Sequence, residues 1–454
     1  MPTFQTLSIA MSGLRAQQQA MDITAHNIAN ASTPGYHRQQ VVLQTGGSRS
    51  MQIPTGVMVD TIRRMQSDYV DRQVRTAHDW LGDWEYKKET LQQVEAVLSE
   101  PGELGLSTYL NRFWNAWEEL SASPESQPAR MAVVESGVAL SDRFHALSQS
   151  LRDIQLGADQ GIVDNTAKIN QLAREVSVLN EQISRAAAGG YPPNDLLDQR
   201  DVLLDELSTL AGIQISGASE GELMICLSGK TLVQGVHVNE ISVQTGPGGW
   251  SQLVWAEDGS PVEITGGQVA GQLQIRDETI AGYIQSLDQI AQTVADRVNA
   301  LHSTGKTADG SPAGNFFLTG ATASTIQVES GLIANPSGVA TSATDNPGDN
   351  QLALAIAAIQ GEALIDNQTI GTAYSGLVGA IGSHSREAIS RCDAYTLSFD
   401  QLNAQRESVS GVSLDEEMLD MVKFQQAYAA SARVVTVINE MIDVIINRMG
   451  VAGG

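Results

Sequence analysis

Apolar residues near the N-terminus recur at alternating spacings of three and four. This spacing places side chains on one stripe of a helix and is typical of helices that pack against other helices. The stripe consists of Phe4, Leu7, Met11, Leu14, Met21, Ala25 and Ile28, and Gln18 is its polar interruption. The pattern predicts a long helix that ends before the turn at Pro34 and Gly35.

The C-terminal segment has the same alternation. A helix is expected after Gly411, where Ser413 and Glu416 match a capping box. Its stripe consists of Met421, Phe424, Tyr428, Ser431, Val435, Ile438, Ile442, Ile445 and Met449. We predict that the two stripes pack on each other and form an assembly interface. The pattern equally allows a closed hairpin of two helices within one chain.

The region between the two ends predicts a helical shaft with a β insertion. Residues 38–65 read as short strands, whereas residues 67–210 are mainly helical and end in DLLDQRDVLLDELSTL, whose leucines share one helix face. This last helix follows the turn GGYPPN and is expected to run antiparallel to the one before it. From Gly212 the sequence changes to alternating β-branched residues with Gly-rich turns, which are typical of antiparallel strands.

The predicted fold is therefore mainly α with a β insertion: paired terminal coiled-coil helices, an elongated helical-bundle shaft and an antiparallel β domain. Residues 1–66 and 406–454 form the terminal helical assembly domain, and residues 67–210, 271–304 and 352–405 form the shaft. Residues 211–270 are assigned to the β domain, and residues 305–351 to a Gly/Ser/Thr-rich loop or small β segment.

Composition narrows the possible functions. A formal charge of −25 and a pI near 4.5 argue against binding to nucleic acid or anionic lipid. Binding to either depends mainly on Lys and Arg side chains that contact the negative phosphates. No apolar run approaches the length of a bilayer, and the first residues lack the basic region and apolar core of a secretory signal. We expect no membrane insertion and, if the chain is exported, a different route.

Residue patterns that carry catalysis or metal binding are missing from the sequence. The seven histidines do not match a metal-ligand spacing, and Cys226 and Cys392 are too far apart in sequence for a CxxC motif. No GxSxG or phosphate-loop motif occurs. We predict no catalytic, cofactor or metal site. The alternative is a binding module in the β insertion, for which Trp250 and Trp255 are the only hint, and two such Trp more often serve packing.

The run SGLRAQQQAMDITAHNIANASTPGYHRQ resembles the N-terminal signature of flagellar rod, hook and first hook-associated proteins. Its matching positions are Asn27, Asn30, Thr33, Pro34, Gly35 and Tyr36. Residues 410–447 and the run PNDLLDQRDVLLDEL resemble the FlgK family of hook-associated proteins in particular. A hook or distal rod protein shares the N-terminal signature and is the nearest alternative. Longer FlgK members carry an outer domain for which residues 305–351 leave little room.

The resemblance implies a structural subunit without enzyme activity, in a ring of copies between flagellar hook and filament. It also implies export through the flagellar type III apparatus to the outside of the cell. The implied partners are other copies of the chain, the hook protein, a second junction protein (hook-associated protein 3) and an export chaperone that covers the C-terminal helix. From the exposed stripes we further expect the terminal helices to order only on assembly, because an unpartnered stripe does not offset its ordering entropy.

Overall fold

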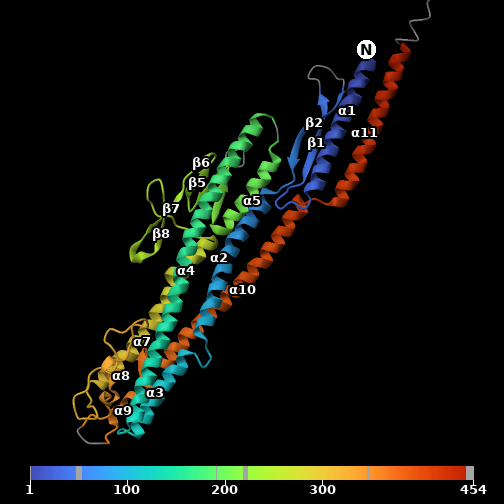
Figure 1. Ribbon diagram of the computed structural model, residues 1–454. Helices are drawn as coiled ribbons and strands as arrows, with labels where there is room; N and C mark the ends of the chain where they lie inside the picture. The colour runs from blue at the N-terminus through green and yellow to red at the C-terminus, as the bar shows by residue number, and fades with distance from the viewer. Residues whose placement is uncertain (1, 48–53, 191, 218–222, 345–347, 446–454) are drawn as a thin grey trace, which may run out of the picture.

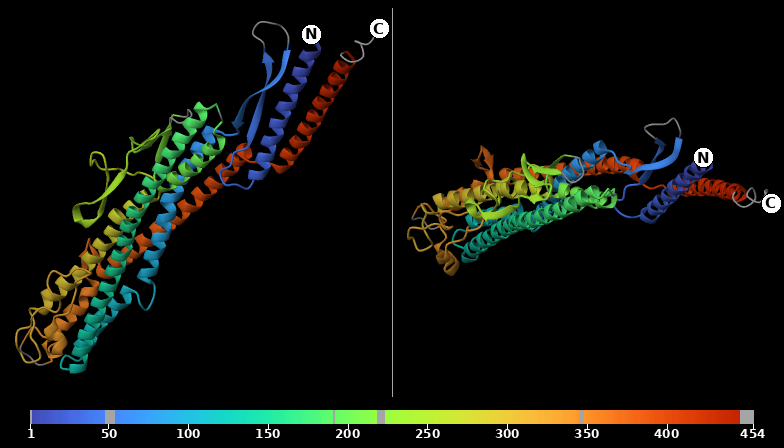
Figure 2. Two further views of the ribbon diagram at one scale, coloured as in Figure 1. Left: turned by 45° about the horizontal axis from the view of Figure 1, so that its top comes forward. Right: turned by 90° about the horizontal axis from the view of Figure 1, so that it is seen from above.

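The computed structural model describes residues 2–47, 54–190, 192–217, 223–344 and 348–445. The chain forms a long rod with both of its end helices at one tip (Figure 1). There α1 (Pro2–Asn30) and α11 (Leu414–Asp443) lie side by side, as all views agree (Figure 2). A hairpin of β1 (Gln39–Gly47) and β2 (Pro54–Arg64) packs on α1. The N- and C-terminal segments therefore make one unit at the tip.

The shaft is built from long helices. Its helices are α2 (Asp68–Leu98), α3 (Leu106–Ala122), α4 (Gln127–Ala188), α5 (Asn194–Leu210), α6 (Gly267–Gln274), α7 (Ile280–His302) and α10 (Ile370–Ser410). A π-helical turn, Ile275–Thr279, joins α6 to α7. α4 has 62 residues and so spans about 90 Å. Its start is set by Ser126, whose side chain accepts a hydrogen bond from the amide of Ala129.

Aromatic residues form the core at the far end of the rod. Phe113 and Trp117 of α3 contact Phe316 and Phe317 from the segment after α7, and all four are fully buried. In its described part, this segment has isolated β-bridges and helix α8 (Ser330–Ala334) but no strand. Beyond it lie α9 (Gln351–Ala358) and a small hairpin of β9 (Ala363–Ile365) and β10 (Gln368–Thr369). The segment closes this end of the shaft rather than projecting from it.

The β insertion consists of two antiparallel sheets. One has the order β3-β4-β5-β6 and the other pairs β7 with β8. The strands are β3 (Ile213–Ser216), β4 (Met224–Leu227), β5 (Lys230–Gln234), β6 (His237–Val238), β7 (Ile241–Thr245) and β8 (Ser251–Trp255). Ile225 and Trp255 share one apolar core with Ile162 of α4 and Leu204 of α5. Because the insertion has no separate core, it is part of the shaft wall.

The predicted fold class is confirmed, including the terminal helices, short strands within residues 38–65, the antiparallel return of α5 and the β insertion. The structure adds that the strands pair as one antiparallel hairpin. One local prediction is wrong. Ser413 does precede α11, but its side chain makes no capping hydrogen bond. Glu416 instead pairs with Arg38, because α11 begins against the strand-forming segment and its first acids face a fixed guanidinium. Within the described residues, no helix is both long and apolar enough to cross a membrane.

Candidate functional site

The terminal helices meet the shaft at a compact polar joint. On one side are the end of α1, the turn that follows it and the start of β1, and on the other are α5 and the link between α10 and α11. The backbone amide of Arg38 donates to the carbonyl of Ser410 at 2.8 Å, and the carbonyl of Arg38 accepts from the amide of Met65. These two backbone hydrogen bonds join the residue before β1 to the end of α10 and to the residue that follows β2.

Asn27 is the centre of the joint. Its side-chain amide donates to the carbonyl of Gln39 and to Glu417 Oε2, each at 2.9 Å. Its Oδ1 accepts from the amide of Gln39 at 3.0 Å and from the hydroxyl of Tyr36 at 2.8 Å. Asn27 and Glu417 are almost completely buried. One fully hydrogen-bonded side chain therefore ties α1 to β1 and to α11.

Tyr36 folds the turn back onto α1. Because its single hydroxyl proton is donated to Asn27, the ring of His26, 2.9 Å away at Nδ1, must donate to the tyrosine oxygen. Burial raises the pKa of Tyr36, and the charges of Asp195, Asp198 and Glu417 raise it further. The hydroxyl therefore stays protonated and remains a donor.

The remaining signature residues shape the turn. The Thr33 hydroxyl donates to Asn30 Oδ1, and the Asn30 amide donates to the carbonyl of His26. Gly35 adopts a φ of +74°, a conformation that residues with a β-carbon rarely adopt. Pro34 precedes it and lines the cleft between the turn and the shaft. These residues set the direction in which the chain leaves α1.

Arg38 fastens α11 to the joint. Its Nε lies 2.6 Å from Glu417 Oε1, its Nη1 lies 3.1 Å from Glu416 Oε2, and its Nη2 lies 3.7 Å from Asp420 Oδ2. Glu417 is only 2% exposed, so this pair is desolvated and depends on complete hydrogen bonding. The first turn of α11 is held by one guanidinium from the segment between α1 and β1.

Alternating acids and bases connect the joint to three shaft elements. Three carboxylates of α5 each bridge to basic groups on other elements. The order of the ladder is His37, Asp198, Arg64, Asp201, Arg75, Asp205 and Arg406, with every contact between 2.6 and 3.0 Å. The bases come from the turn, β2, α2 and α10 in that order. We call this set the α5 ladder.

Electrostatic coupling within the ladder is strong. Burial on its own would raise the pKa of Asp201, but Arg64 and Arg75 outweigh it and hold that pKa below its usual value. Burial on its own would likewise lower the pKa of Arg64 and of Arg75. Asp201, together with Asp198 for Arg64 and Asp205 for Arg75, outweighs burial and raises the pKa of each guanidinium. Asp201, Arg64 and Arg75 therefore stay charged around neutral pH, and their contacts fix how α5, β2 and α2 are oriented.

His37, Asp198 and Asp201 bring potential metal-ligand atoms within 4.8 Å of one another. The guanidinium of Arg64 already lies between the two carboxylates, with its Nη1 2.7 Å from Asp198 Oδ1 and 2.8 Å from Asp201 Oδ2. The positive charge of this cluster is thus supplied by Arg64. The three residues form a salt-bridge cluster with Arg64.

The structure places the predicted assembly residues in two groups. On α11, Met421, Phe424, Val435, Ile438 and Ile442 are half-buried or buried, whereas Tyr428 and Ile445 are exposed, and Met449 lies outside the described residues. On α1, Phe4 and Met11 are exposed, and Leu7, Leu14, Met21 and Ile28 are half-buried.

Small residues make the closest contact on α1. Ala10, Ala16 and Ala20 are its buried apolar positions, covered by α11 and the hairpin, and a β-carbon at Gly13 would lie 3.3 Å from the Ser431 hydroxyl. α1 therefore approaches α11 along its small residues. Its larger apolar side chains lie at the margins of this contact, where another chain can reach them.

Charge is divided unevenly along the chain. Residues 1–66 contain five Arg and two acids, and residues 406–454 contain four bases and seven acids, so these segments together are neutral. The whole formal charge of −25 falls on residues 67–405. Copies of the terminal unit can therefore approach one another with little net repulsion, whereas copies of the shaft repel.

Sequence patterns had indicated Asn27 and the turn, but not the α5 ladder. The signal was present in PNDLLDQRDVLLDEL, in which Asp195, Asp198, Asp201 and Asp205 recur at helical spacing. The leucines of the same run predict only its apolar helix face. The acids were not recognised because their partners lie on elements far away in the sequence.

A long rod whose two end helices pair at one tip, beside a charged joint, is the architecture of an elongated structural protein. Comparison with known proteins specifies which kind. Residues 91–317 match the family described as "Flagellar hook-associated protein FlgK helical domain". Residues 7–37 match "Flagella basal body rod protein", and residues 404–449 match "Flagellar basal body rod FlgEFG protein C-terminal". The chain belongs to the FlgK family of flagellar hook-associated proteins.

Relatives from distant bacteria support this assignment along the full length. Flagellar hook-associated protein 1 of Bacillus subtilis is 31% identical, with 99% of each chain covered. That of Salmonella typhimurium is 25% identical over 96% of this chain and 98% of the other. The flagellar hook junction protein FlgK from Burkholderia pseudomallei shares the fold, with a TM-score of 0.66, 17% identity, and coverage of 74% of this chain and all of the other. The family consists of structural flagellar components and not enzymes.

Proposed function

We propose that this chain forms the ring that joins the flagellar hook to the filament outside the cell. One observation carries the proposal: the α1–α11 pair leaves large apolar side chains exposed on both helices, while the joint below holds the pair in a fixed direction. Such exposed apolar stripes favour contacts with further helices of the same kind. The names of the relatives, flagellar hook-associated protein 1, agree with this position.

In this proposal the partners are other copies of the chain, the hook protein below and hook-associated protein 3 above. The chain reaches its place through the flagellar type III apparatus, and a cytoplasmic chaperone covers α11 beforehand. α1 and α11 become stably ordered on assembly, because their exposed stripes then gain partners. Hydrogen exchange on dilute monomer tests this step, and strong protection throughout α1 and α11 there would contradict it.

The rival functions receive less support. A hook or rod protein would share the matches at both ends of the chain, but the match over residues 91–317 is to the hook-associated helical domain. A ligand-binding module in the β insertion would present its aromatic residues to solvent. Trp255 is instead buried in the core shared with α4 and α5, and Trp250 lies against Arg276.

Removal of the gene tests the junction role directly. Completed hooks should then fail to carry filaments, and filament subunits should accumulate in the culture medium. Restoring the unaltered chain should restore filaments. Filaments of normal number on hooks that lack this chain would overturn the proposal.

A further inference from the structure

A cleft of about 810 Å³ lies beside the joint, between the end of α1 with its turn and the pair α4–α5. Its apolar part includes Val178 of α4 and Val202 of α5, which are 52% and 40% exposed. These two Val side chains lie together in a concave surface, unlike apolar side chains that are exposed singly elsewhere on the shaft. The cleft is therefore a candidate docking surface.

The charged groups at the cleft are mainly acidic. Glu175, Asp195 and Asp198 line it, together with His26 and Arg174. Arg174 is paired with Glu240 at 2.6 Å, and Asp198 is neutralised within the α5 ladder. The side chain of Asp195 is 61% exposed, and Glu175 is half-buried. A partner that places a basic residue beside an apolar stripe would suit this surface.

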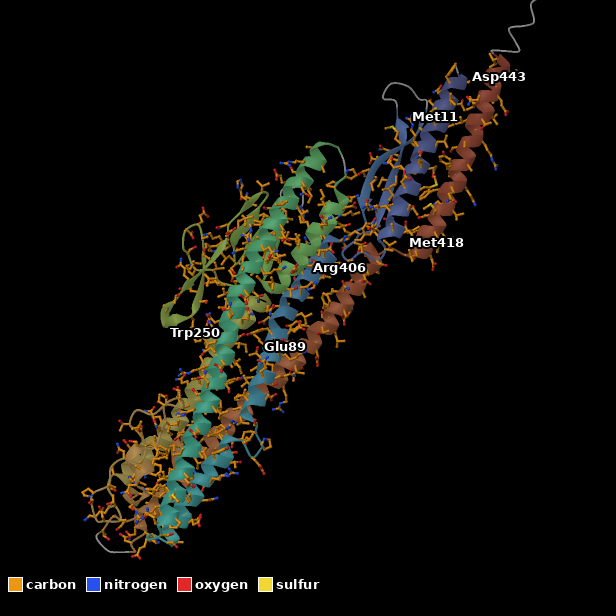
Figure 3. All side chains as sticks on the ribbon, viewed as in Figure 1. Met11, Glu89, Trp250, Arg406, Met418 and Asp443 are labelled. Carbon is orange, nitrogen blue, oxygen red and sulfur yellow. The ribbon has the colours of Figure 1, made fainter. Side chains whose placement is uncertain are left out.

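The outward face of α11 has this character. Its exposed apolar residues are Leu414, Met418, Leu419, Val422, Val434, Val437, Met441 and Val444. The acids of α11 lie near its two ends, and from Met421 to Asn439 its only charged residues are Lys423 and Arg433, both basic. Lys423 is 72% exposed and lies 3.4 Å from Asp420, a surface pair that a partner carboxylate can replace. Figure 3 shows α11 with side chains projecting away from α1 along its length. Since these side chains are exposed in the single chain, they do not fill the cleft of their own molecule.

We propose that the cleft receives the outward face of α11 from a second copy of the chain, with Lys423 facing the acids at the cleft. This inference rests on the proposed assembly into a ring. Two different surfaces that complement each other give a head-to-tail contact, which repeats around a ring when the rotation closes. The contact would also place the neutral terminal unit of one copy, rather than its acidic shaft, against the shaft of the next.

Photo-crosslinking in flagella tests the contact. The photoreactive residue p-benzoyl-phenylalanine replaces Val178, or Val236 as a matched control, since Val236 is 54% exposed and lies in the β insertion. The expected result is a product of two chains from position 178, with its crosslinked peptide within residues 414–444. An adduct with a protein of another mass, or a two-chain product that maps elsewhere, would overturn the proposal.

Charge exchange provides an independent test with unaltered shape. Glu175→Lys and Lys423→Glu should each lower incorporation into flagella by about ten-fold, because each places like charges together. The double variant should recover most of the loss. No recovery would overturn the contact while leaving the ring role intact. If the unaltered chain itself is absent from isolated hook–filament junctions, the proposed function fails first.

Discussion

A β-carbon at position 35 would lie only 2.3 Å from Cγ2 of Val202, so the turn after α1 passes against α5 at a distance that only glycine allows. This contact lies in the joint between the terminal unit and the shaft. Gly35 also has a φ of +74°. Both its conformation and its neighbour therefore demand a residue without a side chain.

Gly35→Ala should lower the free energy of unfolding by about 2–4 kcal/mol, through about 1 kcal/mol of backbone strain and the rest from overpacking. Chemical denaturation of the purified chain measures this loss. Adding Val202→Ala removes the clashing methyl group and should restore the overpacking part but not the strain. A double variant no more stable than Gly35→Ala would contradict this account.

Arg64 separates the buried carboxylate of Asp198 from the partly buried carboxylate of Asp201 in the α5 ladder. Arg64→Met keeps the apolar stem but leaves Asp198 and Asp201 close together without their shared cation. The loss should be about 3–5 kcal/mol in the free energy of unfolding, because removing one partner strands buried charge. Arg63→Met on the same strand is the control, since Arg63 faces solvent and should change stability by less than about 0.5 kcal/mol. Equal effects at both positions would show that the ladder does not stabilise the joint.

Asp79 on α2 gives the shaft a predictable dependence on pH. Burial raises its pKa to about 6, against a hydrogen bond from the amide of Gly267, and Asp83 raises it further. Between its usual pKa and about 6, the unfolded chain releases this proton while the folded chain keeps it. The contribution of Asp79 to stability therefore falls as pH rises through this window, and the full penalty is present at pH 7.

Asp79→Asn should accordingly stabilise the chain at pH 7. We expect about 1 kcal/mol, since the partly exposed carboxyl is screened by solvent. The gain should disappear below about pH 3, where Asp79 is protonated in both the folded and the unfolded chain, and thermal unfolding at the two pH values measures it. Asp309→Asn is the control, because the Thr307 hydroxyl lowers the pKa of Asp309 and no gain is expected. A gain of equal size at both pH values would rule out the titration of Asp79 as its cause.

Periodicity predicted the elements of this fold well because it reports which face of a helix or strand is apolar. The two end helices, the short strands within residues 38–65 and the antiparallel return of α5 all follow from spacing and turn residues. The close contact of α1 with α11 does not follow from the spacing of apolar residues. Ala10, Ala16 and Ala20 contribute little to a hydrophobic pattern, although small residues let helices approach each other closely. Phe4 and Met11, which dominate the pattern, lie outside that contact.

The polar joint was predictable only in part. Asn27 and Gly35 belong to a run whose resemblance to known proteins singles them out, whereas the partners of Asn27 depend on the fold. Glu417 is 390 residues away in sequence, and no local rule pairs them. Glu416 shows the same limit, since a capping role expected from spacing gave way to Arg38, a partner provided by the tertiary structure.

Substitutions at two adjacent residues of α11 can distinguish the pairing of α1 with α11 within one chain from contacts between chains. Ile438 is 3% exposed against α1, whereas its neighbour Val437 is 49% exposed on the outward face. Ile438→Asp buries a charge and should separate α1 from α11, at a cost of about 3 kcal/mol or more to the pair that forms on assembly. Val437→Asp should leave the single chain as stable as before, within about 0.5 kcal/mol, because its carboxylate stays in water.

Both variants should nevertheless join flagella poorly, for different reasons that two measurements distinguish. Each variant, expressed alone, should not support filaments, but a small fraction of it can be incorporated beside co-expressed unaltered chain. Hydrogen exchange on that incorporated fraction should show faster exchange of α1 only for Ile438→Asp. Counts of filaments per cell should be low for both. Normal filament numbers with Val437→Asp would mean that the outward face of α11 has no partner in the ring. The apolar residues along it would then need another explanation, such as contact with a chaperone before export.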